Sequence, residues 1–310
     1  MSMQQPTSHT PPAASPSGII AALGSFLLWG VLPLYWKQLD TIPSFEILCH
    51  RIVWSAVFTA LVLVLAGRFH EVREALASRR TIALLLISSV LVSANWGLYI
   101  WSVNHAHVVE ASMGYYINPL VNVLLGMVFF KDKLRRLQWV AVGFAITGVL
   151  VMVVDFGRLP WIALGLAFSF GFYGLVRKVV AVLPVPGLFL ETLLLSLPAG
   201  GYILWQEMHG VGGLVTGGGL QITLLVCAGV VTSIPLLLFT FGARRLPLPT
   251  LGIAQYLSPT CMFLLGVFVF HEPFGATKLV TFACIWTGVA VYVTDGLIEH
   301  RKITQVRSAE

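Results

Sequence analysis

Ten apolar stretches of spanning length follow one another along the chain, separated by short polar connections. They cover approximately residues 18–36, 45–66, 81–103, 110–130, 137–154, 161–180, 186–205, 220–242, 249–270 and 277–297. A helix needs about 20 apolar residues to cross a hydrocarbon core that is roughly 30 Å thick. The stretches lack the alternation of apolar and polar positions that a barrel strand shows, and they are about twice as long as such a strand. The pattern therefore predicts an all-α polytopic membrane protein with ten transmembrane helices.

The second half of the chain repeats the pattern of the first half. A shift of 140 positions aligns residues 81–155 with residues 221–295 without a gap. Apolar composition alone does not explain the matches Tyr116/Tyr256, Pro119/Pro259, Gly126/Gly266, Thr147/Thr287 and Asp155/Asp295. At a shift of 141 the first span also joins, through Gly30/Gly171 and Lys37/Lys178. We therefore expect two five-helix halves, at residues 18–155 and 161–298.

An odd number of spans in each half means that the second half enters the membrane inverted. Inverted repeats with interrupted helices at corresponding positions are typical of secondary transporters. Here Pro119 and Pro259 occupy corresponding positions in spans 4 and 9, and Pro235 lies in span 8. A proline removes one intrahelical hydrogen bond, so we expect helix breaks at these residues, with free carbonyls near Tyr115 and Gln255.

Composition excludes an ordinary soluble protein. Of the 310 residues, 57% are apolar and only 10% are charged, and the mean hydropathy is +0.87, whereas about a quarter of the residues of a soluble domain are charged. The net charge of +6 is explained by loop composition, so nucleic acid is not an expected partner. Residues 1–17 are rich in Ser, Pro and Thr and lack Lys and Arg, which predicts a disordered tail rather than a signal peptide.

The basic residues predict the orientation in the membrane. Loops 67–80, 131–136, 177–185 and 243–248, together with the tail 299–310, hold fifteen of the nineteen Lys and Arg residues. The opposite side holds only Lys37, Arg158 and Lys278. Since Lys and Arg concentrate on the cytoplasmic side, both termini are expected in the cytoplasm. The even number of spans agrees with this orientation.

Several stretches also carry a family resemblance. Residues 45–55 (FEILCHRIVWS), 95–126 (NWGLYIWSVNHAHVVEASMGYYINPLVNVLLG), 134–142, 166–178 and 233–260 are similar to the RarD-type branch of the EamA, or drug/metabolite transporter (DMT), superfamily. The resemblance covers nearly the whole chain after the tail. It implies ten helices in two inverted repeats, a bacterial inner-membrane location, and a central cavity lined mainly by spans 1, 3, 4, 6, 8 and 9.

Polar and aromatic residues on these spans are candidates to line a substrate cavity. Tyr115, Asn118 and Asn122 share one helical face of span 4, and the repeat places Gln255 and Ser258 on the matching face of span 9. The complete predicted set is Trp29, Asn95, Trp96, Tyr99, Tyr115, Asn118, Asn122, Tyr173, Ser233, Gln255, Tyr256 and Ser258. The alternative for each residue is a bond between helices, typically about 0.6 kcal/mol, or a place in the interfacial aromatic belt.

Charged residues inside the spans are candidates for a gate or for proton coupling. Glu46 and His50 share one face of span 2, and Arg51 follows them. Three interpretations stay open: an interfacial ion pair with a snorkelling arginine, a gate in which Glu46 pairs with Arg51 or with a neighbouring helix, and a proton site. Glu191 has no evident basic partner nearby in the sequence, so it is a candidate for a lone proton site, although its place near the cytoplasmic end of span 7 favours exposure.

The pattern as a whole favours a secondary transporter that moves a small amphipathic metabolite or drug-like molecule by alternating access. The alternative is a non-transporting membrane sensor or assembly factor. The sequence contains no GxxxxGK[ST], HExxH or GxSxG motif, so we expect no enzyme activity, no metal and no cofactor. The expected partners are a small-molecule substrate and the lipid bilayer, with protons as an open question.

Overall fold

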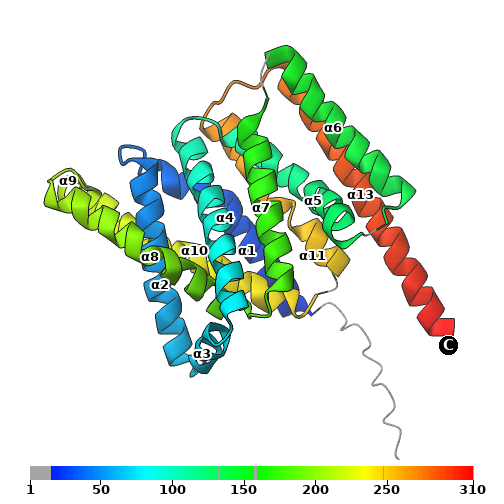
Figure 1. Ribbon diagram of the computed structural model, residues 1–310. Coiled ribbons are helices and arrows are strands. Elements are labelled where there is room, and N and C mark those ends of the chain that lie inside the picture. Colours follow the sequence, from blue (N-terminus) through cyan, green and yellow to red (C-terminus); the bar gives the residue numbers. More distant parts are fainter. Residues whose placement is uncertain (1–14, 132, 157–158, 247, 310) are drawn as a thin grey trace, which may run out of the picture.

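The computed structural model describes residues 15–131, 133–156, 159–246 and 248–309, and all regular elements in these ranges are helical (Figure 1). Ten helices of the described chain are long and apolar enough to cross a membrane. This confirms the predicted fold class. Residues 1–14 of the expected tail lie outside the described residues, and the first helix begins at Pro16 rather than at residue 18.

Nine of the spans are single helices, and the ninth span along the chain is divided. The single helices are α1 (Pro16–Lys37), α2 (Ser44–Leu65), α4 (Arg79–Asn104), α5 (Val108–Phe130), α6 (Arg136–Phe156), α7 (Trp161–Val179), α8 (Pro184–Met208), α10 (Gly219–Ala243) and α13 (Ala276–Ala309). The divided span consists of α11 (Leu248–Ala254), α12 (Leu257–Leu264) and a π-helical turn, η1 (Leu265–Val269). Two short helices, α3 (His70–Leu76) and α9 (Gly213–Thr216), lie in the connections. Helix α13 continues to Ala309, through most of the expected C-terminal tail.

Local sequence explains where several of these helices begin and end. Ser15 and Ser78 cap α1 and α4, and their hydroxyls accept hydrogen bonds from Gly18 N and Thr81 N at 3.4 and 3.3 Å. Helix α5 ends at Lys131, which adopts the left-handed conformation with φ 59°.

The bundle has two ends. We call the end that holds the α1–α2 connection and α9 the α1–α2 face, and the opposite end, which holds α3, the α2–α4 face.

The helix contacts follow the internal repeat. Helix α1 packs on α10 and α12, and its counterpart α7 packs on α4 and α5, while the counterparts α2 and α8 pack on each other, as do α6 and α13 (Figure 1). A Cβ on Gly30 would lie 2.6 Å from Cys261 Cβ, and a Cβ on Gly171 would lie 2.9 Å from Val121 Cγ1. Gly171 is the repeat counterpart of Gly30, and Cys261 is that of Val121. The same close approach therefore occurs in both halves, although the exact limits 18–155 and 161–298 stay a prediction.

The breaks predicted at Pro119 and Pro235 are wrong, and the interruption of the ninth span lies at Gln255 and Tyr256, before Pro259. Helix α5 continues through Pro119 and α10 continues through Pro235, because one missing hydrogen bond does not end a helix whose neighbours hold it in place. Only the ninth span is interrupted, between Ala254 and Leu257. Pro259 is the third residue of α12, where a backbone N–H has no intrahelical acceptor. The Gln255 carbonyl is not free, since it accepts from Ser258 N at 3.4 Å.

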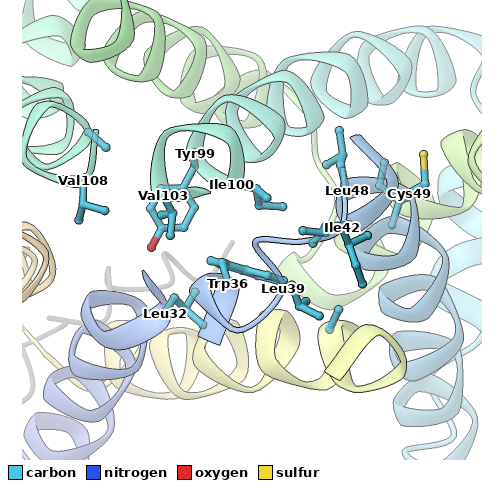
Figure 2. Close-up of a cluster of buried hydrophobic side chains, with 14 of the residues drawn as sticks. Leu32, Trp36, Leu39, Ile42, Leu48, Cys49, Tyr99, Ile100, Val103 and Val108 are labelled. Carbon is cyan, nitrogen blue, oxygen red and sulfur yellow. The ribbon is translucent and has the colours of Figure 1, made fainter. Parts of the chain in front are cut away.

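The largest core cluster joins α1, α2, α4 and α5 near the α1–α2 face (Figure 2). Trp36, Ile47 and Ile100 are fully buried in it, and Tyr99 is 5% exposed. A second cluster around Tyr116 joins α5 to α7 and α13. The core thus draws on helices predicted to line the cavity and also on α2 and α13, whereas the outward surface carries exposed Leu, Ile, Val and Phe side chains.

The contact between α2 and α10 gives a stability prediction. A Cβ on Gly229 would lie 2.2 Å from the carbonyl carbon of Trp54, so Gly229→Ala has to separate the two helix backbones. Overpacking of this kind costs about 1–3 kcal/mol. Gly143→Ala is the matched control, because nothing lies within 4 Å of its added Cβ. We expect thermal unfolding in detergent to show a lower Tm for Gly229→Ala only, and equal Tm values would contradict the close packing.

Candidate functional site

Helices α4, α5 and α7 meet at a set of predicted cavity residues. The rings of Tyr99 and Tyr115 lie edge to face with their centroids 5.9 Å apart. The Tyr115 hydroxyl donates to Asn95 Oδ1 at 3.3 Å. Asn95 Nδ2 in turn donates to the Leu166 carbonyl at 3.0 Å and to Ser169 Oγ at 2.9 Å. Asn95 thus bonds helix α4 to helix α7, which is the interhelical alternative considered for this residue.

A second set joins α5 to the divided span. Tyr116 and Tyr256 stack with centroids 6.1 Å apart, and the Tyr116 hydroxyl shares a 2.6 Å hydrogen bond with Thr260 Oγ1. Asn118 is buried, and its Oδ1 has no hydrogen-bond partner among the described residues. Ser233 Oγ, on α10, is likewise buried and unpartnered within the described chain. Both polar groups are thus enclosed in the bundle without a hydrogen-bond partner in the part of the chain that the structure describes.

The other predicted cavity residues are dispersed. Trp29 packs against Phe26 and Phe239, with centroids 5.7 Å from each. Asn122 is exposed, and its Oδ1 would lie 3.4 Å from a Cβ on Gly171. Gln255 and Ser258 are half-buried at the break of the divided span. Of the predicted set, Asn95, Tyr99 and Tyr115 thus form one contacting group, and Tyr256 contacts Tyr116, which was not predicted.

Glu46 and His50 form a buried polar cluster at the α1–α2 face with Glu207 of α8. Glu46 Oε1 accepts from the backbone N–H of Gly213 and lies 4.0 Å from His50 Nε2. Glu46 Oε2 and both ring nitrogens of His50 are enclosed without a hydrogen-bond partner among the described residues. One ligand atom from each of Glu46, His50 and Glu207 lies within 4.8 Å of the others. This arrangement can hold a shared proton or a cation.

Arg51 lies on a different side of α2 and contacts aromatic rings. Its Cζ lies 4.1 Å from the ring centroid of Trp96 and 5.1 Å from that of Trp36. The residue is 4% exposed. Glu46 and Arg51 do not pair as one interpretation expected, because five residues of a helix place their side chains about 140° apart around its axis. Trp96 therefore contacts the guanidinium group, a role that cavity placement alone did not predict.

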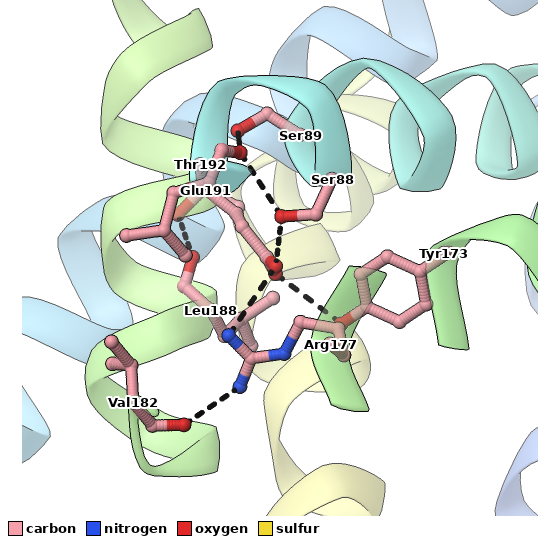
Figure 3. Close-up of polar contacts among 9 residues, drawn as sticks. Ser88, Ser89, Tyr173, Arg177, Val182, Leu188, Glu191 and Thr192 are labelled. Atoms are coloured by element: carbon pink, nitrogen blue, oxygen red, sulfur yellow. Dashed lines mark hydrogen bonds and ion pairs between the residues drawn. The ribbon is translucent and has the colours of Figure 1, made fainter. Parts of the chain in front are cut away.

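Glu191 is buried and paired, so the expectation that it is exposed and has no basic partner is wrong (Figure 3). Its Oε1 accepts from Ser88 Oγ at 2.6 Å and lies 3.6 Å from Arg177 Nη1. The Tyr173 hydroxyl donates to Oε2 at 3.3 Å. Arg177 precedes Glu191 by fourteen residues, and the turn between α7 and α8 brings the two together. Tyr173 is thus part of this network.

Glu272, which follows the divided span, ties that span to helix α5. Its two carboxylate oxygens accept from the backbone N–H groups of Val108 and Val109 at 2.6 and 2.8 Å. Glu272 is 5% exposed. A carboxylate at a helix N-terminus satisfies unpaired N–H groups and interacts favourably with the helix dipole. This contact closes the α1–α2 face between α5 and η1.

Comparison with known proteins decides the family. The EamA-like transporter family model matches residues 16–154. Proteins named Protein RarD from Salmonella typhi and Escherichia coli (strain K12) are 48% and 44% identical over 92% and 93% of this chain, and the matches cover 97% of each relative. An "Uncharacterized transporter" from Vibrio cholerae is 46% identical over 90% of this chain and 93% of its own length. The chain belongs to the RarD branch of the EamA-like transporter family.

The fold of this RarD-branch chain also has a solved counterpart. A crystal structure with 20% sequence identity superposes with a TM-score of 0.57 and covers 90% of this chain and 98% of its own. At that identity the likeness shows the fold alone. The ten spans and the bacterial relatives together make the chain a multi-pass membrane protein of a transporter family rather than an enzyme family.

Sequence reasoning missed two functional candidates in this EamA-family chain. Glu207 was not singled out, because it lies 157 positions from His50 and only the packing of α2 against α8 brings them together. Glu272 was not among the predicted site residues. Its sequence signal was the following Pro273, which ends a helix, and nothing local indicated that the carboxylate reaches a helix N-terminus 164 positions earlier.

The Glu191 network gives a prediction for its ion pair. Arg177→Met leaves the Glu191 carboxylate buried without its cation, and removal of one partner of a buried pair costs about 3–5 kcal/mol. Arg177→Met combined with Glu191→Gln should recover a large part of that loss, since no uncompensated charge remains. The measurement is thermal unfolding of the single and double variants in detergent.

The control for this prediction is Arg68→Met. Arg68 pairs with Glu71 at 2.8 Å, but both side chains are more accessible than Glu191, and surface pairs contribute only about 0–1 kcal/mol. If Arg177→Met and Arg68→Met had the same effect on Tm, the account of Glu191 would be wrong.

Proposed function

We propose that the protein is a secondary transporter that moves a small amphipathic metabolite or drug-like molecule across the bacterial inner membrane by alternating access. The observation that carries the proposal is the repeated pattern of helix contacts in two inverted halves. Two such halves can exchange their conformations, which opens a shared site first to one side of the membrane and then to the other. Membership of the EamA-like transporter family supports this mechanism.

The charge distribution supports an orientation. The connections at the α2–α4 face hold most of the Lys and Arg residues, and such loops stay on the cytoplasmic side. We therefore place both termini in the cytoplasm and the α1–α2 face in the periplasm. In this orientation, the Glu272 contact with Val108 and Val109 holds the periplasmic ends of α5 and η1 together.

The alternative function is that of a membrane sensor or assembly factor without transport. Reconstituted proteoliposomes distinguish the two functions, because only a transporter dissipates a substrate gradient. Vesicles preloaded with a broad metabolite extract should lose specific compounds when they contain the protein, and protein-free vesicles should retain them. Equal retention of every compound in both preparations would favour the alternative.

The placement of the site near Tyr115 and Asn118 gives a prediction for flux. Tyr115→Phe and Asn118→Ala should each lower the initial rate by about twofold to tenfold, since each removes one polar contact with substrate. Thr147→Val on α6 is the control, because its hydroxyl bonds only to its own helix, at the Gly143 carbonyl. Melting curves exclude loss of fold. Normal rates in both Tyr115→Phe and Asn118→Ala would move the site elsewhere.

Proton coupling is a second hypothesis, which the group Glu46, His50 and Glu207 favours. Under this hypothesis, Glu46→Gln and His50→Ala abolish the effect of an imposed pH gradient on net flux, while exchange of labelled for unlabelled substrate continues. Glu71→Gln, on the surface helix α3 at the opposite face, should respond to the gradient as the wild type does. A normal pH response in both Glu46→Gln and His50→Ala would exclude these two side chains as proton carriers.

A further inference from the structure

Arg51 is a buried cation that receives no carboxylate from the described part of the chain. Its Nε and Nη1 are enclosed and have no hydrogen-bond partner among the described residues. The rings of Trp36 and Trp96 are its nearest contacts. Cation–π contacts compensate only part of the cost of removing a guanidinium group from water. A charge at this depth in a membrane protein is typically part of a substrate or ion pathway.

The groups around Arg51 are also hydrogen-bond donors. Trp36 Nε1 and the Tyr99 hydroxyl are enclosed without a partner in the described ranges. The ring of Tyr99 lies edge to face with that of Tyr115 at 5.9 Å, and Tyr115 already donates to Asn95. An enclosed cation that is surrounded by free N–H and O–H groups is suited to an acceptor that brings negative charge.

Glu46 does not supply that charge. It lies about 140° from Arg51 around the axis of α2. Its Oε1 accepts from the N–H of Gly213, and His50 is its nearest ionisable neighbour on α2. The two charged groups of α2 therefore serve separate environments.

The internal repeat shows what is different about Arg51. In the second half, Glu191 lies on α8, the counterpart of α2, and Arg177 lies on α7, where at the shift of 141 it is the counterpart of Trp36. In the second half these positions hold the ion pair of Glu191 and Arg177, which the chain completes by itself. In the first half, the indole of Trp36 stands where the second half has the charge of Arg177. A buried charge of α8 is thus paired within the chain, whereas Arg51, the buried cation of α2, has no carboxylate partner among the described residues.

We propose that Arg51 binds a carboxylate, or another planar anionic group, of the transported molecule. The inference rests on the proposed transport function and narrows its substrate class to amphipathic organic anions. The planar guanidinium fork matches a carboxylate in two parallel hydrogen bonds. The Tyr99 hydroxyl and Trp36 Nε1 add donors, and the rings of Tyr99 and Tyr115 offer an apolar surface to the rest of the substrate.

Binding of matched acid and amide pairs to the purified, full-length protein tests the proposal. The probes are benzoate with benzamide and indole-3-acetate with indole-3-acetamide, each pair similar in shape and different in charge. Binding is measured by calorimetry and by ligand-induced change in Tm. We expect each acid to bind wild-type protein about tenfold or more tightly than its amide, since a hydrogen bond to a charged group is stronger than a neutral one.

Two variants and one control test whether Arg51 causes the preference for acids over amides. Arg51→Met should abolish the preference for acids, and Arg51→Lys, which keeps the charge without the fork, should retain only part of it. Arg245→Met is the control, because Arg245 also lies over an aromatic ring, that of Phe241 at 3.6 Å, but bonds to the Phe241 carbonyl. It should bind acids as the wild type does. If Arg51→Met fails to fold, the comparison of acid and amide binding to the wild-type protein still tests the proposal.

The remaining outcomes are also decisive. Equal affinity of acids and amides for the wild type, absence of acid binding, or an acid preference that survives in Arg51→Met would each overturn the proposal. The same binding assay with phosphatidylglycerol distinguishes a lipid phosphate from a soluble anion. Competition by the lipid without any acid binding would overturn the substrate assignment. Acid binding through Arg51 without flux in proteoliposomes would refute transport alone, whereas flux of neutral compounds that is unchanged in Arg51→Met would refute the anion site alone.

Discussion

A bilayer offers no water to charged side chains, so each charge inside this bundle depends on a partner that the helices bring to it. Glu191 meets Arg177 and Ser88, Glu272 accepts from the N-terminus of α5, and Glu46 accepts from the N–H of Gly213. Each of these contacts links different helices or connections, so the charges also determine which elements can separate. Arg51 alone among these four charged groups meets only aromatic rings.

The two halves of the inverted repeat share a backbone frame but differ in the charged side chains that they carry. Glycines hold α1 against α12 and α7 against α5 in the same way, so the backbone frame is alike in both halves. The side chains placed on that frame differ. The second half pairs its buried charge within the chain near the α2–α4 face, while the first half keeps a donor-rich position nearer the α1–α2 face. A symmetric frame with asymmetric chemistry suits a protein that changes access to one site and binds one kind of ligand.

The spans and the repeat could be predicted from sequence because bilayer thickness fixes helix length and because Tyr, Pro, Gly, Thr and Asp matches are rare by chance in apolar segments. The site could be predicted only in part. Asn95 was predicted to line the cavity, with a bond between helices as the alternative, and its partner Leu166 lies 71 positions away, so only packing determines that contact. Pro119 was expected to break a helix that tertiary contacts keep intact. The charge of Glu191 is evident from its residue type, but its pairing with Arg177 depends on the turn between α7 and α8.

The central claim is that the two faces of the bundle open in alternation, and distances across each face test it most directly. Spin labels at His105 and His271 span the α1–α2 face, and labels at their repeat counterparts Arg245 and Lys131 span the α2–α4 face. Pulsed electron paramagnetic resonance of each pair in lipid nanodiscs should show two distance populations. Alternating access predicts that a ligand or pH that shortens one distance lengthens the other. A single fixed distance in both pairs, or changes in the same direction, would contradict the account.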